Sequence, residues 1–428
     1  AKAPEPDEDD PEAGIHLEDL EVEVEPKAEW HQIFVEAWRL MRDFFYDPNM
    51  HGVDWLKVKK QYEPLVARIS DRDELNDLIG EMVGELSAGH AYVGGGDRPR
   101  GKRIGVGLLG IDAVPDKASG YYKITRILRG DPWDEKCTSP LGAPGLGIQE
   151  GDYLIAIDNR PVRADENYLG LLVNKAEKTI VVTVNSKPTT EGARDHIIKT
   201  LDDEHELRYR DWVLSRRDYV QKRAGDQLAY VHLSDMMGDG LSQWGRDYFP
   251  QCQRPGLIMD VRYNGGGNVA EMILGMLQRS VWAIGRPRAG TLRYHRPSSG
   301  FHGHMLCLCN QETGSDGETF TEGFKRLKLG PVVGKRTWGG WVGIRGGKPL
   351  VDNGWYTQPE FTGWGMEGKW LIEGWGTDPD VDLENDPKSI LEGKDPQLDY
   401  AIDYLLDKIK KEPKPLPPEP PFPIKTQK

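Results

Sequence analysis

Cysteine is scarce in this chain of 428 residues, which has only four, and none stands in a CxxC pair or a zinc-ligand spacing. Cys307 and Cys309 lie two residues apart in an apolar run, so they would share one face of a strand. We therefore expect buried core thiols there rather than a disulfide or a metal site, and we expect no metal or cofactor.

The chain also lacks long runs of apolar residues, and it has fewer basic than acidic residues. No stretch approaches the ~20 consecutive apolar residues that span a bilayer, so we expect no membrane span. The 55 Lys and Arg residues face 69 Asp and Glu residues, and the net charge of −14 argues against nucleic acid or an anionic membrane as the main partner.

The chain begins with Ala1 and has no basic-then-apolar leader, which indicates a removed leader or a fragment of a longer protein. The compartment stays open, with the cytoplasm slightly favoured over the periplasm. The length exceeds that of one ordinary core, so we expect two to three globular domains.

Sequence patterns divide the chain into five segments, which together predict a multidomain α/β protein. The expected segments are a flexible acidic arm over 1–27, a helical bundle over 28–99, a β domain over 100–200, an α/β domain over 201–410 and a Pro-rich tail over 411–428. The tail is expected to be extended, either lying along a neighbouring surface or serving as a peptide ligand.

The helical segment shows apolar residues at three- and four-residue steps from Trp30 to Phe45 and again from Leu75 to Leu86. Asp71 stands where a helix N-cap belongs, and Glu74 follows three residues later, as in a capping box. The segment then ends in Ser87-Ala88-Gly89-His90.

The β segment consists of short apolar strands separated by turn residues. Its stretch Gly147–Val162, GIQEGDYLIAIDNRPV, resembles a PDZ domain, as does ILRGDPW before it. The resemblance implies a helix from about residue 164 through Val173, and a groove that takes a peptide C-terminus as an added strand. The alternative is a PDZ-shaped spacer that binds nothing.

From residue 228 onward, predicted strands alternate with predicted helices. The strands fall at 228–233, 256–262 and 304–310, and the helices at 238–249, 268–279 and 317–328. This alternation predicts an α/β domain with largely parallel strand pairing.

Two loops of that domain each follow a buried strand and open a helix. The first contains Asn264 and the three glycines Gly265, Gly266 and Gly267, whose unhindered backbone allows N–H groups to point into a pocket, as an oxyanion hole requires. The alternative is a tight glycine turn. A phosphate loop is excluded, since neither the Lys-Ser/Thr of a Walker A motif nor a G-x-G-x-x-G pattern is present.

The second loop is Gly314-Ser315-Asp316-Gly317. A serine at a sharp strand-to-helix turn projects its hydroxyl at the positive end of the helix. Taken alone, Ser315 is more often an N-cap than a nucleophile.

The order of the two loops along the chain favours the nucleophile over the N-cap as the role of Ser315. The order D-x-R-x-N-G-G-G, then a strand, then S-D-G, then VVGKRTWGG resembles the catalytic domain of tricorn-type and tail-specific serine proteases. The helical segment ending in Gly89-His90-Ala91-Tyr92, the PDZ-like segment and the stretch IEGWGTDPD from Ile372 stand where that family has them. The resemblance spans residues 29–410 and implies a crotonase-like, ClpP-type α/β catalytic domain.

The resemblance also implies roles for single residues. Ser315 looks like the nucleophile, His90 like the general base and Glu373 like the acid that orients the base. The N–H of Asp316 and a glycine N–H among Gly265–Gly267 look like the oxyanion hole. The family has a serine just before the base histidine, and here that position is Gly89, so either water bridges to Glu373 or Glu373 reaches His90 directly.

Other bases remain open from the residues alone. Many relatives use a lysine near the serine, a place that Lys325 and Lys328 offer here, although the Gly-His-Ala-Tyr motif favours histidine. The rival histidines are His232, His295, His302 and His304. His304 begins the strand that leads to Ser315, so we expect it at the far end of that strand.

The predicted function is that of a serine peptidase acting on oligopeptides or unfolded polypeptides through an acyl-enzyme. The resemblance implies a homo-oligomer, since tricorn relatives assemble as hexamers. The tryptophans of the final third are expected in the core, at a subunit interface or in a substrate pocket. The alternatives are an inactive PDZ-containing peptide-binding scaffold and an acyl-CoA enzyme, for which no basic nucleotide cluster is visible.

Overall fold

The computed structural model describes residues 23–98, 101–131 and 137–426. The chain divides into two compact units. The helical unit comprises residues up to Pro99 together with Gly340–Gly374, and the sheet unit comprises Arg100–Gly339 together with Trp375–Lys428. Most of the acidic arm predicted over 1–27 lies outside the described residues, and the first helix already begins at Pro26.

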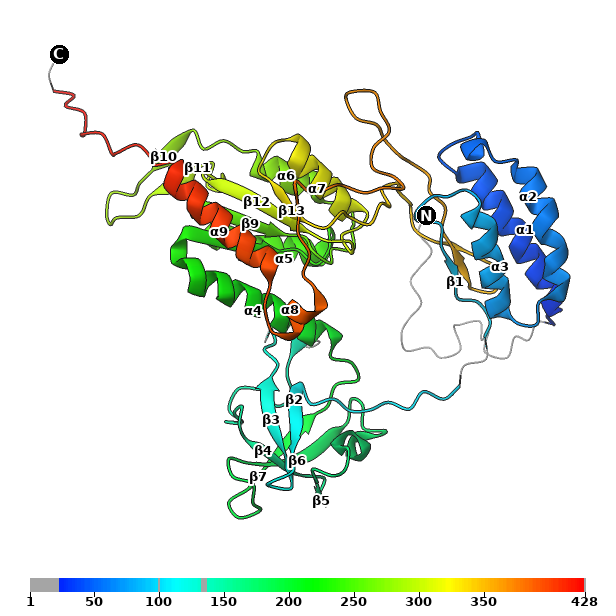
Figure 1. Cartoon of the computed structure of the whole chain (residues 1–428), viewed down its shortest axis with the longest axis horizontal. Helices are drawn as coiled ribbons and strands as arrows, with labels where there is room; N and C mark the ends of the chain where they lie inside the picture. Colours follow the sequence, from blue (N-terminus) through cyan, green and yellow to red (C-terminus); the bar gives the residue numbers. More distant parts are fainter. Residues whose placement is uncertain (1–22, 99–100, 132–136, 427–428) are drawn as a thin grey trace, which may run out of the picture. The chain divides into compact units, whose positions relative to one another are not determined.

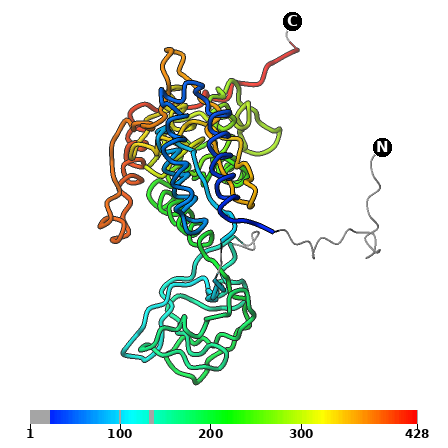
Figure 2. The backbone as a smooth tube through the Cα atoms, turned by 90° about the vertical axis from the view of Figure 1, so that its right-hand side faces the viewer, coloured from blue at the N-terminus to red at the C-terminus, as the bar shows by residue number. Residues whose placement is uncertain are grey.

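The helical unit is built on three helices that lie side by side (Figures 1 and 2). They are α1 (Pro26–Phe44), α2 (Trp55–Tyr62) and α3 (Arg72–Gly84). Asp71 caps α3 as predicted, with its carboxylate accepting the Glu74 N–H at 2.9 Å. Glu74 in turn accepts the N–H of Ser70 at 2.6 Å, one residue before the capping-box position.

A segment far along the chain completes this unit. Strand β1 (Val93–Gly94) pairs with β15 (Trp355–Tyr356), which pairs with β14 (Lys348–Pro349), all antiparallel. Tyr356 is fully buried in the core of the helices, and Arg72 forms a buried ion pair with Asp352 at 2.5 Å. The division into five segments stays a prediction. The structure adds that residues 340–374, far along the chain, belong to the helical unit.

The PDZ-like part of the sheet unit is an antiparallel sheet in the order β2-β3-β4-β6-β7. Its strands are β2 (Ile111–Asp116), β3 (Tyr121–Ile127), β4 (Tyr153–Ile157), β6 (Thr179–Asn185) and β7 (Arg194–Lys199). The helix expected from about residue 164 is wrong in length, since only the 3-10 turn η4 (Tyr168–Leu172) forms, with Asn167 capping it. Gly170 in its middle weakens a longer helix.

The α/β part of the sheet unit contains a five-stranded parallel sheet in the order β16-β13-β12-β9-β8. Its strands are β8 (Leu228–His232), β9 (Gly256–Asp260), β12 (His304–Cys309), β13 (Val332–Gly334) and β16 (Val381–Asp382). The helices are α4 (His205–Ala224), α5 (Gly238–Tyr248), α6 (Ala270–Leu277), α7 (Asp316–Arg326), α8 (Pro387–Leu391) and α9 (Pro396–Lys411). The predicted strand–helix alternation is confirmed.

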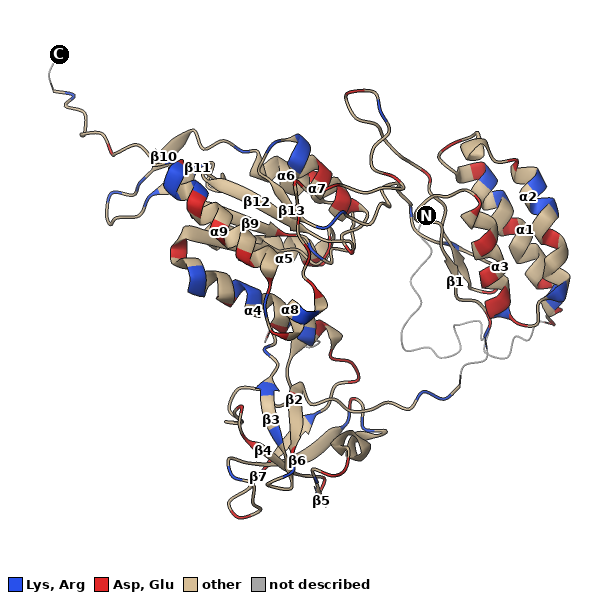
Figure 3. Ribbon diagram, viewed as in Figure 1, with Lys and Arg blue, Asp and Glu red and all other residues tan. Residues whose placement is uncertain are grey.

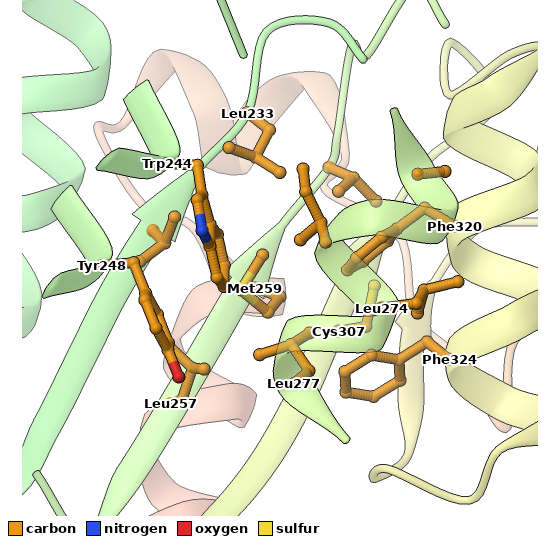
Figure 4. Packing of buried hydrophobic residues seen from close by; sticks show 14 of the residues in the cluster. Leu233, Trp244, Tyr248, Leu257, Met259, Leu274, Leu277, Cys307, Phe320 and Phe324 are labelled. Carbon is orange, nitrogen blue, oxygen red and sulfur yellow. The ribbon is translucent and has the colours of Figure 1, made fainter. Parts of the chain in front are cut away.

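Both faces of this sheet are covered, which explains why every residue of β8 and β9 is buried. On one face, Trp244 and Tyr248 of α5 stack with ring centroids 3.9 Å apart, beside Met259, Cys307, Phe320 and Phe324 (Figure 4). On the other face, α4 and α9 cover residues such as Tyr230 and Leu308.

Charge follows the helix dipoles in this unit. Lys and Arg side chains gather on α4 and at the end of α9 (Figure 3), whose last turn carries Lys408, Lys410 and Lys411. None of the described helices is both long and apolar enough to cross a bilayer. Cys307 and Cys309 are fully buried, as expected for core thiols, and Cys137 and Cys252 are buried as well.

Candidate active site

Ser315 lies in a strained turn between β12 and α7. It is the N-cap residue of α7 and has φ +55° and ψ −123°, in a region that residues other than glycine rarely adopt. The preceding Gly314 donates its N–H to the Asn264 carbonyl at 2.9 Å, and buried Thr313 donates its hydroxyl to the Val261 carbonyl at 2.8 Å. The turn is therefore held by the loop after β9, the neighbouring strand.

Glu318 supports this turn from inside α7 and was missed by the sequence analysis. Its fully buried carboxylate accepts the Ser315 N–H at 3.2 Å, the Thr337 hydroxyl at 2.6 Å and the Gly339 N–H at 2.7 Å. The S-x-x-E spacing of a capping box, read from Ser315, is the signal that would have found it.

The glycine loop lies directly against the serine. A Cβ placed on Gly266 would come within 2.4 Å of the Ser315 Cβ and 3.0 Å of the Asp316 nitrogen, and Gly266 has φ +89°. Only glycine fits this position, for reasons of both space and backbone conformation. Because β9 and β12 are adjacent parallel strands, their carboxyl ends bring the two predicted loops together.

Hydrogen bonds distinguish among the three glycines. The Gly265 N–H donates to the Ser234 carbonyl at 3.2 Å, and the Gly266 N–H donates to Asn264 Oδ1 at 2.9 Å. Within the described part of the chain, the N–H groups of Gly267 and Asp316 have no such acceptor. The loop thus offers the Gly267 N–H, and the helix start offers the Asp316 N–H, for an incoming oxygen.

Asp316 also has a structural task beyond its N–H group. Its carboxylate accepts the Ala270 N–H at 2.9 Å and so caps the first turn of α6. Burial raises the pKa of this carboxyl, an effect that backbone donors such as Ala270 oppose. The residue after the serine therefore connects the starts of α6 and α7.

The other two predicted residues, His90 and Glu373, lie together in the helical unit. Glu373 Oε1 accepts the Gly89 N–H at 2.7 Å, while Oε2 accepts the N–H groups of Trp341 and Val342 at 2.6 and 2.8 Å. Three backbone donors thus fix this carboxylate next to the loop of the histidine. At the position of the family's serine, Gly89 thus contributes a backbone N–H to this carboxylate.

His90 is held in an unusual conformation, with φ +58° and a buried side chain. Its carbonyl accepts the Thr357 hydroxyl at 2.7 Å, which anchors the backbone of the histidine. Burial lowers the pKa of the imidazole, and the negative charge of Glu373 opposes that shift. A lowered pKa favours the neutral imidazole, which is the form that a general base needs.

Four of the six rival bases make contacts elsewhere. His232 is buried against Tyr209, with Nδ1 3.8 Å from Asp260 Oδ1, and His304 Nε2 donates to the Glu412 carbonyl at 2.7 Å. Lys325 donates to the Asp378 carbonyl at 2.7 Å. His295 donates from Nδ1 to the Gly300 carbonyl at 3.1 Å. No group of three potential metal ligands occurs among the residues that the structure describes.

The predicted residues thus fall into two groups, one in each unit. Ser315, Asp316 and the glycines Gly265–Gly267 come together in the sheet unit, and His90 and Glu373 come together in the helical unit.

Three family profiles match successive parts of the chain. The Tricorn protease C1 domain matches residues 26–84, the Tricorn protease PDZ domain matches residues 107–203, and Peptidase family S41 matches residues 227–383.

Individual relatives agree with these profiles. Tricorn protease homolog 1 of Streptomyces coelicolor is 38% identical over 400 residues, which cover 92% of this chain and 37% of that protein. Tricorn protease of Thermoplasma acidophilum is 35% identical over 383 residues, covering 89% of this chain and 35% of that protein. The crystal structure of the tricorn protease superposes with a TM-score of 0.84 at 34% identity, over 90% of this chain and 37% of that one.

The chain spans 34–45% of the length of the first curated relatives that it matches. Within that span, the helical unit, the PDZ-like sheet and the α/β catalytic fold occur in the order of the family. The resemblance inferred from the motifs is thereby confirmed, and the chain belongs to the tricorn type of the S41 peptidase family.

Proposed function

We propose that this chain is a serine peptidase that hydrolyses peptide bonds of oligopeptides or unfolded polypeptides. The observation that carries the proposal is the strained Ser315 turn, with Gly266 against it and the N–H groups of Gly267 and Asp316 beside it. A nucleophile on a sharp turn next to two backbone donors is the arrangement that acyl transfer needs.

In the proposed reaction, His90 takes the proton of the Ser315 hydroxyl as its oxygen attacks the scissile carbonyl carbon. The Gly267 and Asp316 N–H groups stabilise the oxyanion of the tetrahedral intermediate. His90 then gives the proton to the leaving amine, which leaves an acyl-enzyme, and water releases the second product by the same steps. Glu373, whose carboxylate is held in place by three backbone N–H donors, stabilises the imidazolium.

The test is digestion of a mixed peptide library followed by mass spectrometry, with wild type beside Ser315→Ala. We expect cleavage by the wild type and none by the variant. The exposed Ser298→Ala serves as the matched control and should cleave like the wild type. Equal cleavage by wild type and Ser315→Ala would show that Ser315 is not the nucleophile. No cleavage by either protein would favour the inactive peptide-binding scaffold.

A groove in the PDZ-like sheet supports capture of an extended substrate. Strand β2 is an edge strand, and a cavity of about 530 Å³ lies between it and residues 167–169, with Arg208 at its rim. Arg208 pairs there with Asp112 at 2.8 Å and with Glu204 at 2.5 Å. We propose that a peptide adds to β2 and sets its side chains into this groove.

Replacing Leu169, which lines the groove, tests this step. Leu169→Ser should lower kcat/KM several-fold for peptides long enough to reach the groove and leave short peptides unchanged. Leu171→Ser changes the same turn outside the groove lining and is the matched control. Equal losses for long and short peptides would point to misfolding and contradict the proposed capture.

We also propose a homo-oligomer. In the helical unit, Trp364 and Trp370 face each other at 5.6 Å across a hairpin, although each is about two thirds exposed, at 66% and 68%, and Met366 at its tip is fully exposed. Such exposed apolar groups are typical of subunit contacts. Light scattering should give a mass above that of one chain, and Trp364→Ser with Trp370→Ser should lower it; a monomeric wild type would refute the proposal.

A further inference from the structure

The C-terminal arm, residues 412–424, follows α9 along a surface hairpin of the sheet unit. The hairpin consists of β10 (Ala283–Gly285) and β11 (Tyr294–Arg296), paired antiparallel, and the end of α9 lies beside it (Figure 1). The arm is fixed at its start, where His304 Nε2 donates to the Glu412 carbonyl and Lys414 Nζ donates to the Gly303 carbonyl, both at 2.7 Å.

Two arginines hold the arm further along. Glu419 pairs with Arg286 through one carboxylate oxygen and with Arg293 through the other. The same Arg286 guanidinium lies 5.4 Å from the ring centroid of Phe422. Two planar guanidinium groups around one carboxylate give directional recognition, and the stacked ring adds a cation–π contact.

The sequence of the arm explains this geometry. Seven of the eleven residues from Pro413 to Pro423 are proline, which fixes φ near −65° and removes N–H donors. The arm therefore favours a polyproline helix with three residues per turn. Residues three apart share one face, so Leu416, Glu419 and Phe422 form a single stripe.

Leu416 and Glu419 of that stripe line a groove that the arm does not fill. A cavity of about 420 Å³ remains between residues 415–420 of the arm and residues 281–286 of the hairpin, with Arg293 and His302 also in its wall. Trp282 beside the cavity is 76% exposed, and so is Phe422. The site thus combines an apolar wall with two cations, which suits an apolar peptide that carries one acid.

We propose that the face of β10 and β11 is a binding site for proline-rich peptides of the pattern Leu-x-x-Glu-x-x-Phe, and that the arm of the same chain is its resident ligand. Arg286 and Arg293 read the glutamate, and Arg286 also reads the aromatic ring three residues later. Because the arm is tethered, its effective concentration is on the order of millimolar, and it excludes weaker competitors.

The first test measures the affinity of a labelled peptide with the sequence of residues 412–426 for the full chain. Releasing the resident arm with Glu419→Lys and Phe422→Ala should tighten the binding of this peptide by about tenfold or more relative to wild type. Lys425→Ala changes the arm outside the stripe and should behave like the wild type. Equal affinity for wild type and the released variant would overturn the proposal.

The second test asks whether the arginines recognise the peptide. Adding Arg286→Ala and Arg293→Ala to the released variant should abolish peptide binding. The milder pair Arg286→Lys and Arg293→Lys keeps the charge but loses the planar fork, so it should give intermediate affinity. A labelled peptide with Gln in place of its glutamate should bind several-fold more weakly. Unchanged binding by the lysine pair and by the Gln peptide would refute recognition by the arginines.

The third test asks which chain supplies the arm. Cysteines at two positions around the cavity that keep the arginine–glutamate contacts, Trp282→Cys and Pro420→Cys, are joined with a short bis-maleimide, for which the four buried native cysteines should not compete. A link within one chain supports the assignment. Covalent dimers on a denaturing gel would overturn it, because the arm would then occupy the groove of a second copy.

Discussion

The Gly89 N–H donates to Glu373 Oε1 at 2.7 Å, across 284 positions of sequence. This bond stands where the family has a serine before the base histidine. It requires only a backbone N–H, which every residue except proline can supply. The acid of the proposed triad is therefore positioned entirely by main-chain donors, which are those of Gly89, Trp341 and Val342.

The first prediction concerns Gly89 itself. Gly89→Ala keeps the N–H and should leave kcat/KM within about threefold of wild type, whereas Gly89→Pro removes the donor and should lower it by about tenfold or more, as expected for a lost hydrogen bond to a charged group. Steady-state kinetics on one peptide substrate measures both. A severe loss in the alanine variant, with normal folding by circular dichroism, would contradict this reading.

The second prediction concerns the charge of Glu373. This charge raises the pKa of His90 against the effect of burial. Glu373→Gln should therefore lower the pKa of His90 and move the acidic limb of the kcat/KM profile to lower pH, while kcat falls by about 10²-fold or more through loss of imidazolium stabilisation. An acidic limb that moves to higher pH would show that Glu373 does not act on the base.

The third prediction concerns the pH dependence of the wild type. The proposed base works only when neutral, and burial lowers the pKa of His90 below its ordinary value of 6.5. Activity should therefore rise with pH and reach half of its plateau below pH 6.5. A half-maximum well above that value would point to a different base, such as Lys325 or Lys328.

The fourth prediction compares two neighbouring glycines. Gly266→Ala places a Cβ 2.4 Å from the Ser315 Cβ at a φ of +89°, so we expect activity to fall by more than 10²-fold and the free energy of unfolding by about 1–3 kcal/mol. Gly265→Ala meets open space and should be close to wild type in both measurements. Equal effects of the two substitutions in kinetics and urea unfolding would contradict the described contact.

The fifth prediction concerns the buried carboxylate of Glu318. Glutamine keeps one acceptor oxygen but turns an NH₂ group toward N–H and hydroxyl donors, so Glu318→Gln should cost about 1–3 kcal/mol in the free energy of unfolding and lower kcat. Glu322→Gln on the same helix loses only an i,i+4 pair with Arg326, worth about 0.3–0.5 kcal/mol. Similar destabilisation of both variants would argue against the special role of Glu318.

Local patterns predicted much of the fold. Most of the apolar residues that recur at three- and four-residue steps from Trp30 to Phe45 lie in α1. The alternating strands and helices predicted from residue 228 form the parallel sheet and the helices that cover it. Asp71 caps α3 as its side chain predicted, because a cap depends on residues only three positions apart. The helix predicted in the PDZ-like segment is only the short turn η4, because Asn167 caps its start and Gly170 lies in its middle.

The sequence by itself determined which residue types could do chemistry, namely a serine and three glycines at two strand-to-helix turns, since turn chemistry and strand burial are local. The tertiary structure decided that the Gly265 N–H donates to the distant Ser234 carbonyl, while the Gly266 N–H donates locally to Asn264 Oδ1, two positions before it, so that Gly267 and Asp316 keep their N–H groups available. It also decided that residues 340–374 complete the helical unit and place Glu373 on Gly89. Contacts across hundreds of residues leave no periodic trace in a sequence, because they depend on how the elements pack and not on the spacing within any one of them.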